Sequence, residues 1–406
     1  ESRGLGDVYK RQLSTSAAIA ACLASACFHH GASLHTAGFR LVSGDIAGIQ
    51  DFIFSLSGES GRGIAKLLRG RSFAVGIMNM LAAKMITAYA GLPSLCCIMC
   101  AGGRFKVLLP DTAAALEAVR RARHEIAEWA HRRFFGDLKI IIDEGVVFSL
   151  DEFSVQSMAD VLMCCDRSLA CEKHRPLATV LCNENAWIDR SRYGSMAQRR
   201  ACPVCGREPS GGEDAAGMRL PGENCGYFRT LGQMLVRGKY LAILAAQNEK
   251  YLLGRFDVRI LPEIDDPNGY DMLWRINLHE QNNGNHPLPV MIFASRGPRA
   301  EKDSEDDTPA DSDITFETMA ENAAGFKALA VLKADVDNMG YILSTGFGKR
   351  LSISRTVSFS RMLNYFFAGY LPCLLRDRYP QTYTLFAGGD DLCLIGPWDR
   401  MINLAA

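Results

Sequence analysis

The chain has 406 residues, of which 48% are hydrophobic, and its 45 basic side chains balance 45 acidic ones. Such a chain is globular with material for two to three domains, and its zero net charge means that any RNA contact requires a local patch or partner subunits. No apolar run reaches the length of a membrane span, and the Ala-rich stretch 17–28 lacks signal-peptide flanks, so no membrane partner and a cytoplasmic location are expected.

The first third of the chain is predicted to begin with a helix over Ser14–Phe28, where Ser and Thr precede an Ala-rich run. An amphipathic helix is expected around Ala113–Phe135. Between them lies a basic segment that is either a phosphate-facing stripe or an ordinary solvated helix face. Its members are Arg62, Lys66, Arg69 and Arg71.

The fourteen cysteines are a second distinctive feature. Several lie inside apolar runs, which indicates reduced core residues rather than a disulfide framework. The exception is Cys202-Pro203-Val204-Cys205-Gly206. A Cys-x-x-Cys turn followed by Gly points two thiolates at one ion and is typical of half of a zinc site.

A strand that ends in acids is predicted in the last quarter of the chain. The apolar run Ala328–Leu332 leads into Lys333-Ala334-Asp335-Val336-Asp337-Asn338-Met339-Gly340. Acids at a strand end, followed by a glycine-containing turn, can hold a metal ion and present backbone N–H groups to phosphate. The alternative is an Asp-rich loop that caps the next helix, which would account for Asp337 or Asn338.

The tetrapeptide Gly388-Gly389-Asp390-Asp391 lies between two apolar runs and is the most informative motif of the chain. Two glycines supply the positive φ angles of a tight turn, so the motif predicts a β-hairpin that carries paired carboxylates. Adjacent carboxylates repel each other, and Mg²⁺ is the natural cation between them because it prefers oxygen ligands and is shared with substrate phosphates. An ordinary surface turn is the alternative.

A helical stretch over Ser358–Leu371 separates the two acidic motifs, which gives the order strand, helix, hairpin. This is the β-α-β-β core of a ferredoxin-like palm, in which the first strand and the hairpin are adjacent and their acids converge. Asp335, Asp390 and Asp391 would then form a two-metal site that suits attack by a hydroxyl on a nucleotide α-phosphate.

The sequence also predicts that this unit occurs twice. Asp45 lies 290 residues before Asp335, and the Gly-Gly pair at Gly102 lies 286 residues before the pair at Gly388. A duplicated palm explains both offsets. In the first copy the places of the two acids are taken by Arg104 and Phe105, so that copy is not expected to hold the same metals.

In order and spacing together, these motifs resemble the large palm-domain subunit of type III-A (Csm) CRISPR-Cas effector complexes. The resemblance runs from about Ser14 to the last residue and rests on five stretches. They are Gly44–Phe54, Lys66–Phe73, Leu332–Gly340, Ser358–Phe367 and Gly388–Asp391.

The resemblance implies a subunit that works with guide RNA, target RNA and small CRISPR subunits in a multi-subunit antiviral complex. On target RNA binding, its second palm would convert ATP to cyclic oligoadenylate with Mg²⁺ or Mn²⁺, and its first palm would help to hold a second ATP. The resemblance assigns catalysis and metal binding to Asp335, Asp390 and Asp391. It assigns nucleotide binding to Asp337, Asn338, Gly340, Gly388 and Gly389.

The resemblance also bears on the cysteine motif, because the family carries a second Cys-x-x-Cys just before a Phe-x-x-Leu-Gly stretch, here Phe228–Gly232. Cys225 fits the second cysteine, but Gly222 stands in place of the first. Zinc would therefore be held by Cys202, Cys205 and Cys225, with the fourth ligand missing. A weakened three-thiolate site, a fourth ligand from elsewhere and an empty remnant all remain open.

The expected fold class is α+β, with two ferredoxin-like palm domains joined by a cysteine-bearing linker module. Residues 1–12 look like translated adapter or assembly sequence, and residues 13–38 would be the remnant helix of a missing HD nuclease domain, so HD nuclease activity is not expected of this chain. The remaining parts are a degenerate first palm (39–181), the linker module with an acidic disordered loop (182–313), and a second palm that is incomplete at its C-terminus (314–406).

Two other functions stay open at the level of the sequence. A stand-alone nucleotide cyclase of the diguanylate type also uses a Gly-Gly-acid-acid hairpin, although the second palm copy and the cysteine module argue against it. A non-catalytic scaffold for RNA and smaller subunits would leave the acids as turn residues.

Overall fold

The computed structural model describes most of the chain, and its residues form two compact units. Described are residues 2–29, 31–33, 36–57, 63–154, 157–182, 190–276, 288–291, 314–337, 339, 342, 346, 352–388 and 391–406. The first unit is Glu1–Ile49, Val75–Ile188 and Val336–Met362, and the second is Gln50–Ala74, Asp189–Asp335 and Leu363–Ala406. Within the described ranges three antiparallel sheets occur together with helices, so the expected α+β class is confirmed.

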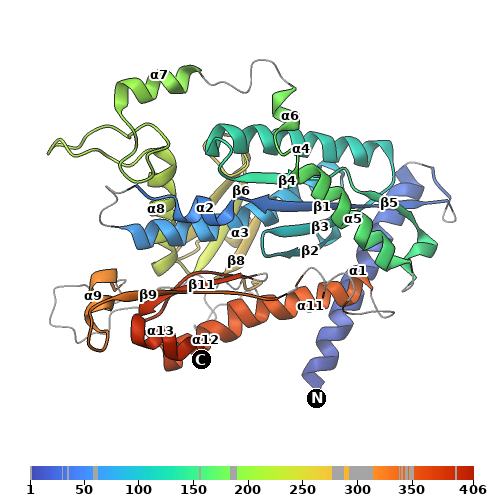
Figure 1. Cartoon of the computed structure of the whole chain (residues 1–406). Helices are drawn as coiled ribbons and strands as arrows, with labels where there is room; N and C mark the ends of the chain where they lie inside the picture. The colour runs from blue at the N-terminus through green and yellow to red at the C-terminus, as the bar shows by residue number, and fades with distance from the viewer. Residues whose placement is uncertain are drawn as a thin grey trace. The chain divides into compact units, whose positions relative to one another are not determined.

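A five-stranded sheet forms the centre of the first unit (Figure 1). Its order is β2-β3-β1-β4, with β5 also paired to β1, and the chain order strand, helix, hairpin, helix, strand is that of a ferredoxin-like unit. The strands are β1 (Gly38–Ala47), β2 (Cys97–Ala101), β3 (Arg104–Pro110), β4 (Lys139–Ile142) and β5 (Val146–Ser149). Because β1 has partners on both edges, most of its residues are buried.

Helices cover this sheet and connect its strands. α4 packs against β4, and α5 packs against β1, β4 and β5. α4 is the predicted amphipathic helix: Thr112 caps it by accepting a hydrogen bond from Ala115 N (3.2 Å), and Phe135 ends it in a left-handed conformation (φ 56°). The helical segments are α1 (Ser2–Ala24), η1 (Ser25–His29), η2 (Ser94–Cys96), α4 (Ala113–Phe134), η3 (Leu150–Phe153), α5 (Met158–Lys173) and α6 (Ala178–Leu181).

Two helices differ from the sequence prediction. The helix predicted over Ser14–Phe28 begins earlier, because α1 starts at Ser2, so the Ser and Thr residues at 14–16 lie inside the helix instead of at its start. α3 (Ile64–Tyr89) has the length and apolar composition of a membrane span, whereas the sequence analysis expected no segment of this kind. However, 67% of its most apolar window is buried, as in a core helix of a folded protein.

The second unit contains two three-stranded sheets (Figure 1). In the first, of order β7-β6-β8, α8 packs against β7; in the second, of order β10-β11-β9, α9 and α13 pack against β9 and β11. The strands are β6 (Tyr240–Ala245), β7 (Phe256–Leu261), β8 (Met272–Arg275), β9 (Leu329–Asp335), β10 (Tyr383–Gly388) and β11 (Asp391–Pro397).

The remaining helical segments precede, connect or follow these strands. The helix predicted over Ser358–Leu371 is present between β9 and β10 in the chain, as α11, η7 and α12. The segments are α2 (Ile49–Phe54), α7 (Arg190–Arg199), α8 (Glu223–Arg237), η4 (Pro267–Gly269), α9 (Phe316–Glu321), α11 (Ile353–Tyr365), η7 (Phe366–Tyr370), α12 (Leu371–Arg378) and α13 (Trp398–Ala405).

The β2-β3-β1 and β10-β11-β9 sheets share one pairing register. Seven residue pairs join β1 to β3, and seven join β9 to β11. They run from Phe39↔Pro110 to Asp45↔Arg104 in the first sheet, and from Leu329↔Pro397 to Asp335↔Asp391 in the second. Each hairpin also has one register shift at the same place, between Cys97 and Met99 in β2 and between Thr384 and Phe386 in β10. Shared bulges of this kind are structural features rather than accidents.

This register refines the comparison of the two copies by one residue. Ala101 pairs with Arg104 at the end of one hairpin, and Gly388 pairs with Asp391 at the end of the other. Arg104 is therefore the counterpart of Asp391. The comparison by sequence motif placed Arg104 opposite Asp390, because that comparison matched the two Gly-Gly pairs instead of the strand ends.

A close crossing of two helices forms part of the core of the second unit. A Cβ atom at Gly70 would lie 1.8 Å from Phe228 O, and one at Gly232 would lie 1.8 Å from Lys66 O, so only glycine fits where α3 meets α8. Beside this contact, Arg69 donates a hydrogen bond to Gly232 O (3.2 Å).

The basic segment on α3 is largely buried, which neither sequence interpretation predicted. Arg71 donates hydrogen bonds to Phe52 O (2.9 Å), Ile53 O (3.1 Å) and Ser55 O (3.0 Å) at the end of α2. Arg69 and Arg71 are 2% and 3% exposed. They bind backbone carbonyls and are therefore neither a phosphate stripe nor a solvated face; Arg62 lies outside the described residues.

Candidate functional site

The acids predicted on the first strand and on the hairpin are opposite each other in the β10-β11-β9 sheet. Asp335 ends β9, Asp391 begins β11, and the two are direct partners in the antiparallel pair. Directly paired residues point to the same face of a sheet, with Cβ atoms about 4.5 to 5.5 Å apart. Asp335 is exposed and Asp391 is half-buried, so a ligand from solvent can reach both.

Two carboxylates in this position need a counter-charge. Like charges directly opposite on neighbouring strands destabilise the pair, and an oxygen-preferring divalent cation removes that repulsion. Two carboxylate groups on one face, at an accessible strand end, are a donor set that fits Mg²⁺ or Mn²⁺. Cys393 lies two residues after Asp391 in β11. Burial raises the pKa of its thiol to about 11, so this thiol stays protonated at neutral pH.

Other predicted members of the site are placed as follows. Gly388 ends β10 and pairs with Asp391, and apart from its chain neighbours no described residue has an atom within 4 Å of where its Cβ would be, which leaves open space beside the acids. Asp337 is exposed, two residues beyond the end of β9. Outside the described residues lie Asn338, Gly340, Gly389 and Asp390.

The equivalent position in the first unit has a different charge pattern. Asp45 pairs with Arg104 across β1 and β3, with Arg104 Nε 3.8 Å from Asp45 Oδ1, and Lys173 forms a second ion pair with Asp45. Asp45 is buried. Two protein cations thus take the place that an acid and a metal ion would have in the second unit.

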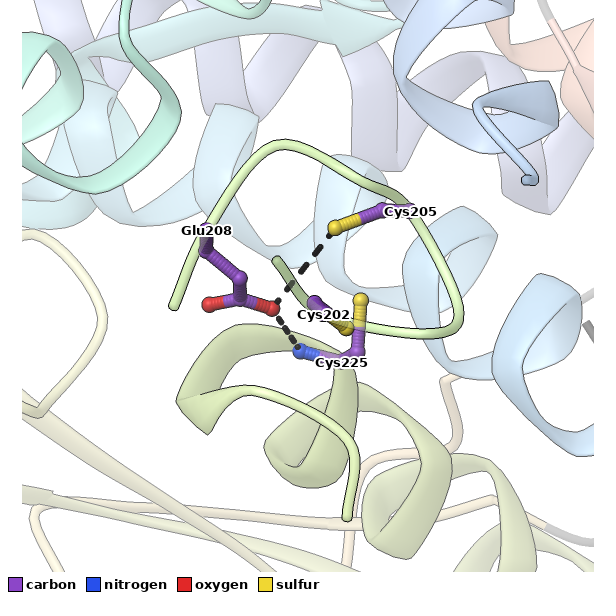
Figure 2. Close-up of side chains that lie close together, drawn as sticks. All are labelled: Cys202, Cys205, Glu208 and Cys225. Carbon is purple, nitrogen blue, oxygen red and sulfur yellow. Dashed lines mark hydrogen bonds between the residues drawn. The ribbon is translucent and has the colours of Figure 1, made fainter. Parts of the chain in front are cut away.

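A second group of ligands lies in the cysteine module (Figure 2). The three predicted cysteines, Cys202, Cys205 and Cys225, lie together with Glu208, and their ligand atoms are all within 4.8 Å of one another. The sequence prediction missed Glu208. The available signal was an acid three residues after Cys205, in the pattern Cys-Gly-x-Glu. A search limited to Cys and His ligands does not find a glutamate.

Backbone and side-chain donors surround this group. Cys202 Sγ accepts hydrogen bonds from Gly222 N (3.2 Å) and Val204 N (3.4 Å). Arg71 Nη2 donates to Cys225 Sγ (3.4 Å). Hydrogen bonds from the Cys205 and Cys225 thiols lower the pKa of Cys202. All fourteen cysteines are free thiols, in agreement with the prediction of reduced cysteines.

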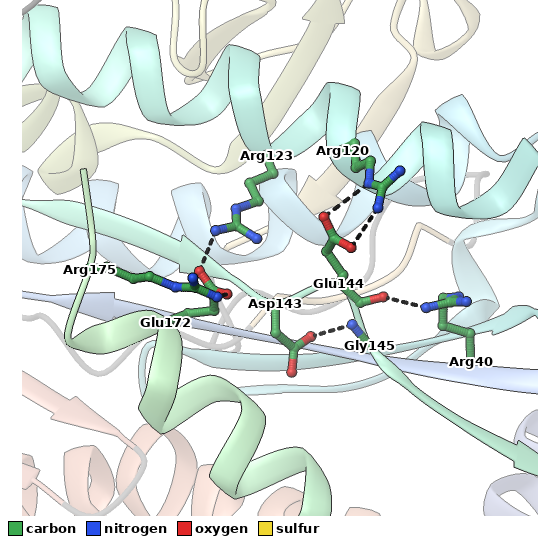
Figure 3. Close-up of polar contacts among 8 residues, drawn as sticks. All are labelled: Arg40, Arg120, Arg123, Asp143, Glu144, Gly145, Glu172 and Arg175. Carbon is green, nitrogen blue, oxygen red and sulfur yellow. Dashed lines mark hydrogen bonds and ion pairs between the residues drawn. The ribbon is translucent and has the colours of Figure 1, made fainter. Parts of the chain in front are cut away.

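A network of ion pairs links α4 and α5 and the turn from β4 to β5 in the first unit (Figure 3). Arg120 binds Glu144 through two hydrogen bonds of 2.9 Å, and Glu172 pairs with both Arg123 and Arg175. Within this network Asp143 Oδ1 accepts hydrogen bonds from Ser43 N (2.8 Å) and Gly145 N (3.0 Å). The bonds join elements of one unit, so the network holds α4, α5 and the turn from β4 to β5 together.

Two parts of the chain match known protein families. Residues 38–188 match the Csm1 subunit domain B, and residues 328–406 match the second palm domain of Cas10/Cmr2.

Curated relatives cover nearly the whole chain. It is 27% identical over 393 residues to the CRISPR system single-strand-specific deoxyribonuclease Cas10/Csm1 (subtype III-A) of Thermococcus onnurineus, with 90% of this chain and 48% of the relative covered. It is 23% identical over 407 residues to the protein of the same description from Mycobacterium tuberculosis, with 90% and 47% covered. The chain therefore spans about half the length of the curated relatives it matches.

Solved structures share the fold. A Csm1-Csm4 cassette in complex with one ATP superposes with a TM-score of 0.69 at 21% identity, over 95% of this chain and 50% of that chain. A Csm1-Csm4 cassette in complex with cA4 superposes with a TM-score of 0.66 at 20% identity, over 95% and 49%. At such identities the likeness concerns the fold alone.

Proposed function

Because this chain belongs to the Csm1/Cas10 family of type III-A CRISPR systems, we propose that its C-terminal sheet is the nucleotidyl cyclase site that joins ATP into cyclic oligoadenylate. The observation that carries the proposal is the direct pairing of Asp335 with Asp391 beside the Gly-Gly-Asp-Asp hairpin. Solved relatives of this fold hold ATP and cA4, which are the substrate and product class proposed here.

In the proposed reaction a ribose hydroxyl of one ATP attacks the α-phosphorus of the next. A new P–O bond forms, the bond to the leaving pyrophosphate breaks, and the hydroxyl proton passes to solvent. Asp335, Asp390 and Asp391 would hold Mg²⁺ or Mn²⁺, which supplies charge neutralisation for the nucleophile and the leaving group. The open space beside Gly388 lets the triphosphate approach the backbone.

In the proposed function the second palm is catalytic, and the first palm helps to bind nucleotide. The common register of the two sheets, with its common bulge, supports an internal duplication and hence two palm domains at about 39–181 and 314–406. The ion pairs of Asp45 with Arg104 and Lys173 support a first palm that binds nucleotide without a metal ion. Asp337, Asn338, Gly340 and Gly389 complete the proposed nucleotide site of the second palm.

The proposed setting is a cytoplasmic complex with guide RNA, target RNA and smaller Csm subunits. The solved relatives are cassettes of Csm1 with Csm4, so a Csm4-like subunit is the first partner to expect. Since the net charge of the chain is zero, its contribution to RNA binding is expected to come mainly through such partners.

The test uses the complex assembled with this chain's partner subunits, guide RNA, target RNA, ATP and Mg²⁺, with products resolved by mass. Asp335→Asn and Asp391→Asn should each lower cyclic oligoadenylate formation on the order of 100-fold or more, because each removes a carboxylate from the metal site. Asp265→Asn, an exposed acid elsewhere in the second unit, is the matched control and should keep normal output.

Two outcomes would contradict the proposal. Unchanged product in both variants would make the acids structural and leave the domain as a scaffold. Cyclic products built on guanine would assign the site to a diguanylate-type cyclase instead.

A further inference from the structure

The cluster around Cys202 has the composition of a metal site and is slightly wider than one (Figure 2). Three thiol sulfurs and one carboxylate oxygen lie within 4.8 Å of one another. In a tetrahedral Zn²⁺ centre the ligand atoms are about 3.5 to 3.8 Å apart, as follows from metal–ligand distances of about 2.0 to 2.3 Å. A contraction of the cluster by roughly 1 Å thus brings all four ligands into bonding distance of one ion.

Glu208 is held in a position that suits a ligand. Its Oε2 accepts the backbone N–H of Asn224 (3.0 Å) at the N-terminus of α8. Its Oε1 accepts the N–H of Cys225 (3.0 Å) and lies 3.9 Å from Cys205 Sγ (Figure 2). The helix terminus therefore orients the carboxylate and turns one of its oxygens towards the thiols.

The three cysteines and Glu208 would be stabilised by a cation among them, because most of these side chains are buried. Cys202 and Cys225 are each 2% exposed and Glu208 is 5% exposed. A buried carboxylate is costly unless paired, and each neighbouring thiolate adds a like charge. A divalent metal ion compensates for these charges, and Arg71, which donates to Cys225 Sγ, offsets part of the remaining negative charge.

Gly222 explains how the carboxylate reaches this position. Position 222 precedes Cys225 by three residues, which is where a Cys-x-x-Cys pair would have its first thiol. A Cβ atom there would lie 2.4 Å from both Cγ and Cδ of Glu208 and 2.6 Å from Pro209 O. A side chain at 222 and the carboxylate of Glu208 therefore compete for the same space.

We propose that Glu208 is the fourth ligand of a Cys₃Glu structural metal centre, most simply of Zn²⁺, and that Gly222 is the residue that admits it. The sequence left open a three-thiolate site, a site completed by a ligand from elsewhere, and an empty remnant. The proposal is the second of these, and the added ligand, Glu208, comes from the same loop as Cys202 and Cys205. On binding, the metal displaces the protons of Cys202, Cys205 and Cys225 to solvent, and the ionised Glu208 completes the tetrahedron.

The test measures metal binding by the purified, reduced full chain. Zinc content is measured by mass spectrometry, affinity by competition with a chromophoric chelator, and ligand type by the visible spectrum after Co²⁺ substitution. We expect one ion per chain and a tetrahedral Co²⁺ spectrum with three thiolates. Glu208→Gln should weaken metal affinity about 10- to 100-fold or more. Glu213→Gln, an exposed acid of the same module, should leave it unchanged.

Melting curves with and without a chelator separate a ligand from a helix cap. A capping carboxylate stabilises the metal-free and metal-loaded chains alike, whereas a ligand stabilises only the loaded chain. Glu208→Gln should therefore lower the melting temperature mainly when metal is present. An equal loss in both conditions, with normal metal affinity and an unchanged Co²⁺ spectrum, would overturn the proposal, as would a parental chain that binds no metal.

A double variant keeps the test decisive if Glu208→Gln does not fold. Glu208→Ala with Gly222→Cys removes the carboxylate and places a thiol in the space it occupied, with a shift of Pro209 O, which lies 2.6 Å from the new Cβ. Metal affinity should return to within a few-fold of the parental value, and the Co²⁺ spectrum should change to that of four thiolates. Failure of this variant to bind metal, with normal folding by circular dichroism, would show that position 222 does not face the metal and would also overturn the proposal.

Discussion

At the scale of the residue, one register position separates the two similar sheets. Asp391 faces Asp335 in the second unit, and Arg104 faces Asp45 in the first. An acid in that position leaves a negative site that attracts a divalent cation, whereas an arginine neutralises its partner directly. Under the proposed function, the choice between a metal site and an ion pair thus depends on one side chain at the start of the second hairpin strand.

A buried carboxyl in the first unit predicts a pH dependence of stability. Asp143 is 0% exposed, and burial raises its pKa from 3.8 to about 6. Because the folded state binds this proton more tightly than the unfolded state, the ionised group destabilises the fold above pH 6, and that destabilisation is relieved as pH falls from 6 towards 4. The difference is on the order of 1 to 3 kcal/mol.

Asp143→Asn tests this prediction. Asparagine keeps an oxygen that can accept the hydrogen bonds of Ser43 N and Gly145 N but carries no charge. The melting temperature of the variant should therefore change less between pH 7.5 and pH 5 than that of the parental chain. An identical pH profile in both proteins would show that Asp143 does not titrate in this range.

At the scale of the element, the crossing of α3 and α8 predicts a sharp difference between two glycines of one helix. Gly232→Ala would place Cβ 1.8 Å from Lys66 O and force the helices apart, at a cost of about 2 kcal/mol or more. The Cβ of Gly226→Ala meets no atom of the described residues within 4 Å beyond its own helix backbone, so this change should be neutral or stabilising by up to about 1 kcal/mol. Chemical denaturation of both variants measures the difference, and equal losses would contradict the crossing.

Elements were predictable where the signal is local. The order strand, helix, hairpin followed from apolar runs and glycines, because pairing in a hairpin is decided over a few residues. The convergence of Asp335 with the hairpin followed from the β-α-β-β topology that this order indicates. The start of α1 was wrong, because Ser and Thr near 14–16 resemble a cap but lie within a longer helix.

Tertiary partners were not predictable in the same way. Arg71 binds carbonyls at the end of α2 and a thiol of α8, so its burial depends on residues up to 154 positions away. Glu208 is close to its cysteines in sequence, yet its role depends on the fold of the loop against α8 and on the missing side chain of Gly222.

At the scale of the whole molecule, substitutions at the same register position are expected to have different effects in the two units. In the assembled complex, Arg104→Gln should lower cyclic oligoadenylate formation less than Asp391→Asn does and leave its Mg²⁺ dependence unchanged, since Arg104 belongs to the palm that is proposed to bind nucleotide without a metal ion. Asp391→Asn should abolish product. A loss in Arg104→Gln as deep as in Asp391→Asn would move the chemistry to the first unit.

The contact between Glu208 and Gly222 also limits how sequences of this kind can diverge. Since a side chain at position 222 overlaps the carboxylate, each of the two residues is acceptable only in the presence of the right partner. A lineage that changes from a thiol at 222 to a carboxylate at 208 must lose the side chain at 222 before or together with the gain of the acid. Relatives should therefore show either a cysteine at 222 or a glutamate at 208, and not both.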